Sequence, residues 1–259
     1  MFNFLKKIFG SPVYQTGALS KPVDPRNIDI SEVQAPVAIP DSYVASMPVS
    51  EVKDQGAEPS CVGWTFAQYC EYVLFKLTGN VYRINGDVLY KKAKKEDGIP
   101  DLRGTYPQVV AKIVTRDGVE DENGNTHRIS TGYAFVPTQD FEAVCQALYQ
   151  NQVLASSFII DTNWFIGIIG KLLSSIGGHE VLLYGYEKYP VYILKGINTW
   201  GVGWVGRIAG MLDRNVKAGH FEMKYEDVKD QFTTLIALVP VPKQILIKSQ
   251  VMNTDFSLT

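Results

Sequence analysis

The segment Val52–Phe66 reads V-K-D-Q-G-A-E-P-S-C-V-G-W-T-F and places Gln55 six residues before Cys61, in an approach rich in glycine and proline. Two distant segments, Gly177–Gly185 (G-G-H-E-V-L-L-Y-G) and Asn198–Trp204 (N-T-W-G-V-G-W), supply a histidine and then an asparagine. A thiol acyl-transfer site needs a thiolate that attacks, an imidazole that carries the proton, an amide that orients the imidazole, and a donor that binds the oxyanion. The predicted catalytic residues are Cys61, His179, Asn198 and Gln55.

Cys61 is the predicted nucleophile. We expect Ser60 to cap one long buried helix that runs from Cys61 and ends at Gly79. At the first turn of a helix, free backbone N–H groups and the positive end of the dipole favour a thiolate, and a His179 imidazolium would add to this. The alternatives at these positions are an inert buried thiol, a structural histidine at the start of a strand, and an ordinary turn residue at Gln55.

Composition and charge argue against several other functions. The chain has 259 residues, of which 46% are hydrophobic and 20% charged, with a net charge of −2. This length suits one large domain or two lobes, and the charge gives no support for nucleic-acid binding. No apolar run reaches the roughly 18–20 residues of a transmembrane segment. We expect no metal or other cofactor, because the three cysteines and three histidines match no zinc spacing.

We expect the protein to occupy a reducing compartment, with a cytoplasmic or virion-associated location. Besides Cys61, only Cys70 and Cys145 could form a disulfide, and free buried thiols are the commoner outcome. The start, Met1–Gly10, is apolar with two lysines but lacks the long uncharged core and cleavage site of a signal peptide. It favours a short amphipathic helix docked on the domain or on a partner, with membrane contact as a lesser alternative.

The order of elements along the chain predicts an α+β fold, because helices come first and strands follow. Residues 1–38 are expected to form an extended N-terminal arm, since they are rich in proline and show little periodicity. A body at 39–240 then divides into a helical lobe at about 39–125 and a sheet lobe at about 126–240. The remaining residues, 241–259, form a tail. A substrate cleft is expected between the lobes.

Hydrophobic periodicity and turn residues predict the individual elements. The lysine-rich run K-K-A-K-K in the second helix is most simply a solvated face. The predicted helices are 61–79, 87–98, 105–117 and 140–150; the predicted strands are 153–160, 180–186, 191–198 and 218–225, and a turn is expected at 121–125.

Five segments in order resemble the papain family of cysteine peptidases, in the divergent form seen in bacteria and viruses. The resemblance covers roughly residues 39–240, and the spacings from Gln to Cys and from Asn to Trp are those of the family. The matching segments are V-K-D-Q-G…S-C at 52–61, G-T-Y-P-Q-V-V-A-K-I-V-T-R-D-G-V at 104–119, G-H-E-V-L-L-Y-G-Y at 178–186, N-T-W-G-V-G-W at 198–204 and G-H-F-E-M-K-Y-E-D-V at 219–228.

The resemblance implies a two-lobed fold with the active-site cleft between a helical lobe and an antiparallel β-sheet or barrel lobe. It implies Cys61 as the nucleophile, His179 as the acid and base, and Asn198 as the residue that orients the histidine. Gln55 and the Cys61 N–H would form the oxyanion hole. Residues expected to line the substrate cleft are Gly104, Thr105, Gly178 and Trp200.

The chain also departs from the family pattern. Glu58 and Pro59 stand where the family has Cys-Gly, so its common disulfide in that loop is absent. Val62 replaces the aromatic residue that normally follows the nucleophile. Residues 205–218 form an insertion that could rim the cleft or contact a partner. The long helical inhibitory propeptide of the family is not recognisable in residues 1–38.

The function that we predict is a thiol endopeptidase that cleaves a polypeptide substrate through an acyl-enzyme. The alternative is a non-proteolytic structural or interaction protein, for example a component of a virion or another large assembly, that keeps this fold as a scaffold. Its protein partner would contact the N-terminal arm, the 205–218 insertion or the C-terminal tail. A third hypothesis is that the same residues catalyse acyl transfer or deamidation.

Overall fold

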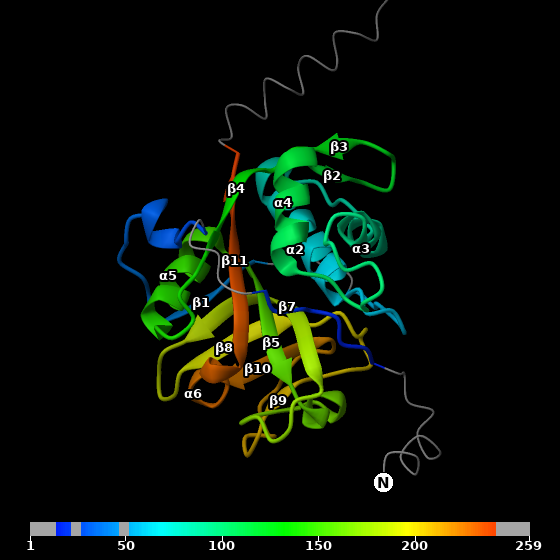
Figure 1. Cartoon of the computed structure of the whole chain (residues 1–259). Helices are drawn as coiled ribbons and strands as arrows, with labels where there is room; N and C mark the ends of the chain where they lie inside the picture. The colour runs from blue at the N-terminus through cyan, green and yellow to red at the C-terminus, as the bar shows by residue number, and fades with distance from the viewer. Residues whose placement is uncertain (1–13, 22–26, 47–51, 242–259) are drawn as a thin grey trace, which may run out of the picture.

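The computed structural model describes residues 14–21, 27–46 and 52–241. The predicted amphipathic helix at 1–10 and the tail from 242 onward lie outside these residues. The described residues form two lobes, one helical and one built on a sheet (Figure 1). In this part of the chain, no helix is both long and apolar enough to cross a membrane.

Three helices make the first lobe: α2 (Cys61–Thr78), α3 (Gly86–Lys94) and α4 (Pro107–Asp117). Helix α2 is buried on most sides, as its apolar sequence predicts, and it ends at Gly79 in the left-handed conformation. Helix α4 begins two residues later than predicted, because Pro107 takes the first helical position, where its missing N–H would have no partner anyway.

The lysine-rich run on α3 is not a purely solvated face, because Lys94 turns inward. Its Nζ donates to backbone carbonyl oxygens of the following loop, including that of Gly104 at 3.1 Å, and pairs with Asp97 at 2.9 Å. The same Asp97 carboxylate accepts from the Thr105 hydroxyl at 3.0 Å. Lys94 and Asp97 therefore hold the loop that carries Gly104 and Thr105.

The second lobe contains a seven-stranded antiparallel sheet. Six of its strands have the order β10-β8-β7-β5-β11-β4, and β1 is the seventh, paired with β7. The four predicted strands are confirmed as β5, β7, β8 and β10, whereas β1, β4 and β11 were not predicted. Strand bounds are β1 (Ser42–Val44), β4 (Ser130–Phe135), β5 (Leu154–Ile160), β7 (Gly177–Glu187), β8 (Ile193–Ile197), β10 (His220–Lys224) and β11 (Phe232–Pro240).

Short elements complete the described chain. The predicted fourth helix is α5, which covers one face of the sheet, and the turn at 121–125 joins β2 to β3. The 205–218 insertion contains β9, which pairs in parallel with β6. The bounds are η1 (Ile30–Glu32), β2 (Val119–Glu120), β3 (Thr126–His127), α5 (Phe141–Asn151), η2 (Thr162–Ile166), β6 (Ile168–Ile169), β9 (Arg207–Ile208), α6 (Tyr225–Val228) and η3 (Lys229–Gln231).

Strand β7 has a hydrophobic core on each face. Leu182 packs in the core that contains α2, and Val181 and Leu183 pack in the core that contains Leu148 of α5. Because successive side chains of a strand point to opposite faces, a strand buried on both faces reads as a continuous apolar run. This explains the apolar run V-L-L, and it places β7 between α2 on one face and α5 on the other.

The described parts of the N-terminal arm pack on the body, and they are extended except for the short 3-10 helix η1. One part lies against β4, where the Phe135 N–H donates to the Ile28 carbonyl at 2.9 Å. The other part, Tyr14–Lys21, passes between α2 and β7 as the dark-blue segment of Figure 1 and is called the covering segment below. Strand β1 also joins the sheet, although the helical lobe was predicted to begin at residue 39.

Candidate active site

Cys61 is the first residue of α2 and is fully buried. Its sulfur has backbone hydrogen bonds with Glu180, with Val62 in its own helix and with Gly17 of the covering segment. The contact with Glu180 places the thiol beside the start of β7, one residue from His179. Helix α2 and strand β7 therefore bring Cys61 against the backbone of the residue that follows His179.

Burial under the covering segment changes the acidity of the thiol. Desolvation raises the pKa of Cys61 to about 12, although the backbone hydrogen bonds lower it. The sequence predicts the opposite shift, because a helix N-terminus favours a thiolate. The difference has a physical cause: the helix dipole contributes a modest stabilisation, whereas removing a charge from water costs far more. The thiol in this structure is therefore neutral.

His179 lies near the start of β7 and is also fully buried. Its Nε2 lies 2.7 Å from the side-chain oxygen Oδ1 of Asn198, while its Nδ1 has no hydrogen-bond partner among the described residues. Desolvation lowers the pKa of His179 to about 4, against the raising effect of Asn198. The imidazole is therefore neutral, and its unpaired nitrogen is free to exchange a proton.

Trp200 covers the histidine. The two rings are stacked, with centroids 4.1 Å apart, and Trp164 meets the imidazole edge-on at 6.3 Å. Trp204 packs against Trp200 and donates its indole N–H to the Trp164 carbonyl at 2.7 Å. The two tryptophans after Asn198 therefore both shield the histidine from water and fill the core.

Gln55 is held by the chain that follows Asn198. Its backbone N–H donates to the Thr199 carbonyl at 2.8 Å, and its side-chain oxygen accepts from the Thr199 hydroxyl at 2.7 Å. These contacts direct the amide nitrogen toward the carbonyl oxygens of Glu58 at 2.7 Å and of Gln15 at 3.2 Å. The Gln55 amide N–H, which was predicted to bind an oxyanion, thus donates to a carbonyl oxygen of the covering segment.

The covering segment is bound through its backbone, as an extended peptide. The Thr105 N–H donates to the Gly17 carbonyl at 2.9 Å, and the Thr105 carbonyl accepts from the Leu19 N–H at 3.0 Å. On the other side, the N–H groups of Gly17 and Ala18 point to the Gly178 carbonyl at 2.9 and 3.0 Å. This pairing with Thr105 is parallel.

All four residues that were predicted to line the cleft contact this segment. Thr105 and Gly178 bind its backbone, and Trp200 stacks on Tyr14 with centroids 4.7 Å apart. Gly104 allows a close approach, since a β-carbon there would lie 2.2 Å from the Gly17 carbonyl oxygen. The four residues therefore surround one extended stretch of polypeptide.

Sequence reasoning missed two buried ionisable groups near the site. Lys53, two residues before Gln55, forms a buried ion pair with Glu71 of α2 at 2.6 Å. Glu180, directly after His179, is fully buried and bonds the Ser157 hydroxyl. The signal for Glu180 was a single carboxylate in the otherwise apolar run of β7. Lys53 offered no such signal, because its partner is far away in sequence.

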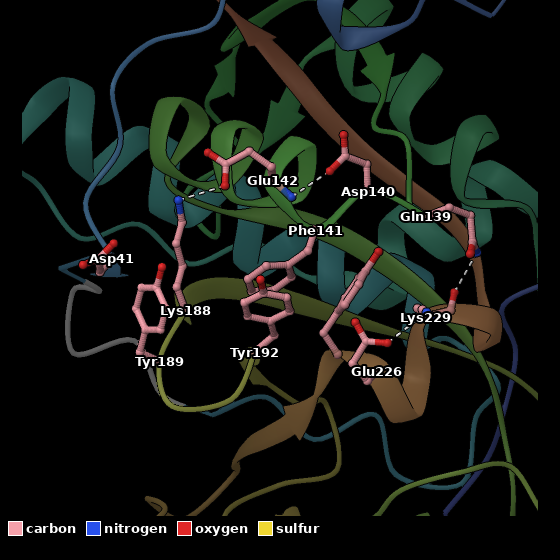
Figure 2. Close-up of a pocket in the computed structure, with 11 residues that line it drawn as sticks. Asp41, Gln139, Asp140, Phe141, Glu142, Lys188, Tyr189, Tyr192, Glu226 and Lys229 are labelled. Carbon is pink, nitrogen blue, oxygen red and sulfur yellow. Dashed lines mark hydrogen bonds and ion pairs between the residues drawn. The ribbon is translucent and has the colours of Figure 1, made fainter.

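The surface hollow of Figure 2 does not coincide with this site. The described residues contain no group of three or more histidine, cysteine or acidic side chains that could hold a metal ion. The hollow in Figure 2 encloses about 460 Å³ between the start of α5 and the β7–β8 connection. Phe141, Tyr189 and Tyr192 line it, with Lys188 and several carboxylates, and it contains none of the predicted site residues.

Solved structures with the same fold are papain-like cysteine proteases. Xylellain, a cysteine protease from Xylella fastidiosa, is 18% identical, with a TM-score of 0.71 over 88% of this chain and 96% of that chain. Procathepsin B S9 from Trypanosoma congolense is 15% identical, with a TM-score of 0.67 over 88% and 87%. Procathepsin L 3 of Tenebrio molitor larval midgut is 19% identical, with a TM-score of 0.65 over 92% and 79%.

The chain therefore has the papain-like, two-lobed α+β fold that the sequence resemblance implied. At these identities the likeness establishes the fold. No family model matches the chain, and no curated protein matches it in sequence.

Proposed function

We propose that this protein is a cysteine peptidase that hydrolyses peptide bonds through an acyl-enzyme. One observation carries the proposal: the site beside Cys61 and His179 already holds an extended polypeptide, the covering segment. Gly178 and Thr105 bind its backbone and not its side chains. A site that recognises extended backbone in this way suits a polypeptide substrate.

Each proposed catalytic residue has a chemical role. The Cys61 thiolate attacks the scissile carbonyl carbon, and the oxyanion that forms accepts hydrogen bonds from the Gln55 amide and the Cys61 N–H. The His179 imidazolium gives its proton to the departing amine, and Asn198 holds the ring in the required orientation. Water then attacks the thioester, with His179 as the base, and the acid product leaves with the thiol restored.

The proposal includes a blocked state. Gly17 covers the thiol, and the Gln15 carbonyl takes the donor of Gln55, so no substrate carbonyl can enter. Both the neutral thiol and the neutral imidazole follow from this burial, because each charged form would lose its hydration. Displacement of the covering segment would admit water and restore the thiolate–imidazolium pair.

Substitution of Gly17 tests this proposal without touching a catalytic residue. A β-carbon on Gly17 would lie 2.0 Å from the Pro59 carbonyl oxygen, so Gly17→Leu must displace the segment. The matched control is Ser20→Val, since Ser20 is exposed in the same segment. Iodoacetamide labelling at pH 6, with mass spectrometry of each cysteine, should be at least about tenfold faster at Cys61 in Gly17→Leu than in wild type or the control.

The activated variant is then given a library of peptides. Cleavage by Gly17→Leu that is lost on adding Cys61→Ala supports a peptidase, and the product masses separate hydrolysis from acyl transfer. If Cys61 in Gly17→Leu labels quickly but no peptide is cut, peptide hydrolysis is wrong. If Cys61 labels no faster than Cys70 and Cys145 in any variant, the scaffold reading replaces the proposal.

A further inference from the structure

Glu180 carries a buried carboxyl oxygen that nothing in the described chain uses. Its Oε2 accepts from the Ser157 hydroxyl across the β5–β7 pair, but its Oε1 has no partner among the described residues. The side chain is fully buried, and desolvation raises its pKa to about 8. Buried polar atoms are nearly always hydrogen-bonded in native proteins, so an unpaired carboxyl oxygen beside the candidate site requires an explanation.

Glu180 lies on the face of β7 that the covering segment occupies. Alternate residues of a strand share a face, so Gly178, Glu180 and Leu182 point the same way. A β-carbon on Gly178 would lie 3.7 Å from the Ala18 Cβ, and Ala18 shares a hydrophobic cluster with Leu182 and Cys61. Two residues along a strand span about 6–7 Å. A longer side chain in place of Ala18 would therefore reach the Glu180 carboxyl.

A second unpaired polar side chain lies on the opposing helix. Gln68 of α2 is buried, and neither its amide oxygen nor its amide nitrogen has a partner in the described part of the chain. It lies one turn beyond Thr65, whose hydroxyl donates to the Glu180 backbone carbonyl at 3.0 Å. Residues three apart share a helix face, so Gln68 is on the face of α2 that packs on β7. The interface between α2 and β7 thus holds two buried polar side chains, Gln68 and Glu180, that have unpaired atoms among the described residues.

We propose that Glu180 determines substrate specificity by binding the lysine or arginine side chain of the substrate residue that takes the place of Ala18. This inference rests on the proposed peptidase function. A cationic donor would pair with Oε1 and make a charge-assisted hydrogen bond, whereas an apolar side chain would leave a buried acceptor unpaired. Ala18 has only a methyl group, so the covering segment leaves the carboxyl free.

The first test measures the preference of the activated enzyme. The full-length Gly17→Leu variant is given peptides randomised on both sides of the cleaved bond, then a matched pair with arginine or norleucine at the selected position. We expect kcat/KM to favour arginine by at least about tenfold. In Gly17→Leu with Glu180→Gln, which keeps the side-chain size, the ratio should fall to within about threefold of unity. A ratio between two substrates is insensitive to a general loss of activity.

The outcomes separate the inference from the function on which it rests. Cleavage without a basic preference at any position, or a preference that survives Glu180→Gln, overturns the inference and leaves the peptidase standing. Absence of cleavage overturns the peptidase function, and the second test then decides whether Glu180 recognises a cation.

The second test needs no catalysis. Ala18→Lys and Ala18→Met place side chains of similar length on the covering segment of the otherwise intact chain. If Glu180 binds a cation, the Ala18→Lys variant should protect Cys61 from iodoacetamide about tenfold better than the Ala18→Met variant, and Glu180→Gln should abolish the difference. Equal protection in both variants contradicts the proposal. If neither variant folds, the peptide ratio alone decides.

Discussion

His179 and Asn198 are joined by a 2.7 Å hydrogen bond in which the ring Nε2 donates to the side-chain oxygen Oδ1. The Thr199 backbone N–H donates to the same oxygen at 2.7 Å, which fixes the orientation of the amide. The neutral imidazole therefore carries its proton on Nε2, and the lone pair lies on Nδ1. This tautomer is the one that can accept a proton from a neighbouring thiol.

Removal of this hydrogen bond should lower kcat and leave KM nearly unchanged. Asn198→Ala, in the activated Gly17→Leu chain, removes the hydrogen bond that fixes the orientation and the tautomer of the ring. A lost hydrogen bond of about 1–3 kcal/mol corresponds to a decrease in kcat of roughly 5- to 150-fold. Steady-state kinetics on one peptide measures both constants, with Cys61→Ala as the background. A rise in KM alone would show that Asn198 binds substrate instead.

The lowered pKa of His179 predicts a loss of stability in acid. The unfolded chain binds a proton near pH 6.5, but the folded chain does so only near pH 4. Between these values the unfolded state carries more protons, so stability falls as the pH falls. Glu180 has the opposite effect, since its raised pKa, about 8, makes the folded state the better proton binder between about pH 4.5 and 8. The two effects partly cancel in the wild type.

Glu180→Gln removes the opposing effect and exposes that of His179. In this variant the free energy of unfolding should fall by about 2–3 kcal/mol between pH 7 and 4.5, relative to the double variant with His179→Gln. Urea denaturation at several pH values measures the difference. Parallel pH profiles for the two variants would mean that His179 titrates normally in the folded protein.

The buried ion pair between Lys53 and Glu71 should be costly to break from one side. Glu71 also accepts from the Ile84 N–H at 2.7 Å, and its pKa is raised because burial outweighs the attraction of Lys53. Lys53→Met leaves the carboxylate buried and unpaired, which should lower the free energy of unfolding by about 3–5 kcal/mol. Adding Glu71→Gln should recover much of this, because the amide oxygen still accepts from Ile84.

The matched control for that variant is Lys188→Met. Lys188 pairs with Glu142 at 2.8 Å, but the Glu142 side chain is 55% exposed, so water replaces the partner. We expect Lys188→Met to lower the free energy of unfolding by less than about 1 kcal/mol. Denaturant midpoints compare the two variants. Similar losses from Lys53→Met and Lys188→Met would contradict the assignment of the Lys53 pair as buried and structurally important.

Lys94 should control how firmly the covering segment is held. Lys94→Met removes the donors that fix the loop of Gly104 and Thr105, and Thr105 makes two of the backbone hydrogen bonds to the segment. We expect Cys61 to label severalfold faster in Lys94→Met, whereas Lys91→Met, on the exposed face of the same helix, should label as wild type does. Identical labelling rates in both variants would show that the loop holds its position without Lys94.

Much of the fold follows from local sequence patterns. The helix that starts at Cys61 was predictable because a long apolar run ends at Gly79. Ser60 stands at the position before it, as predicted, but its hydroxyl donates to Asp87 and makes no capping hydrogen bond. The strand that carries His179 was predictable from its apolar run between glycines. Strand β11 was within reach of the same reasoning, but Ser42–Val44 was not, since three residues carry no period and their pairing depends on β7.

The candidate site, like the fold, has a part that was predictable from the sequence and a part that depends on tertiary contacts. Motif spacing identified Cys61, His179, Asn198 and Gln55 as candidates, and tertiary structure supplied the His179–Asn198 contact and the neighbours of Gln55. The shift of the Cys61 pKa was predicted with the wrong sign. A sequence shows that a thiol begins a helix, but not that a distant segment removes water from it.

By itself, the sequence determined the α+β class, the long central helix and the identity of the four candidate catalytic residues, because these depend on short-range periodicity and on motif spacing. Only the tertiary structure decided that Tyr14–Lys21 covers Cys61, and that the buried Glu180 side chain has an oxygen with no partner among the described residues. The covering contacts join backbone groups from three distant parts of the chain. Every residue has backbone N–H or carbonyl groups, so no pattern of side chains in the sequence predicts where these groups pair.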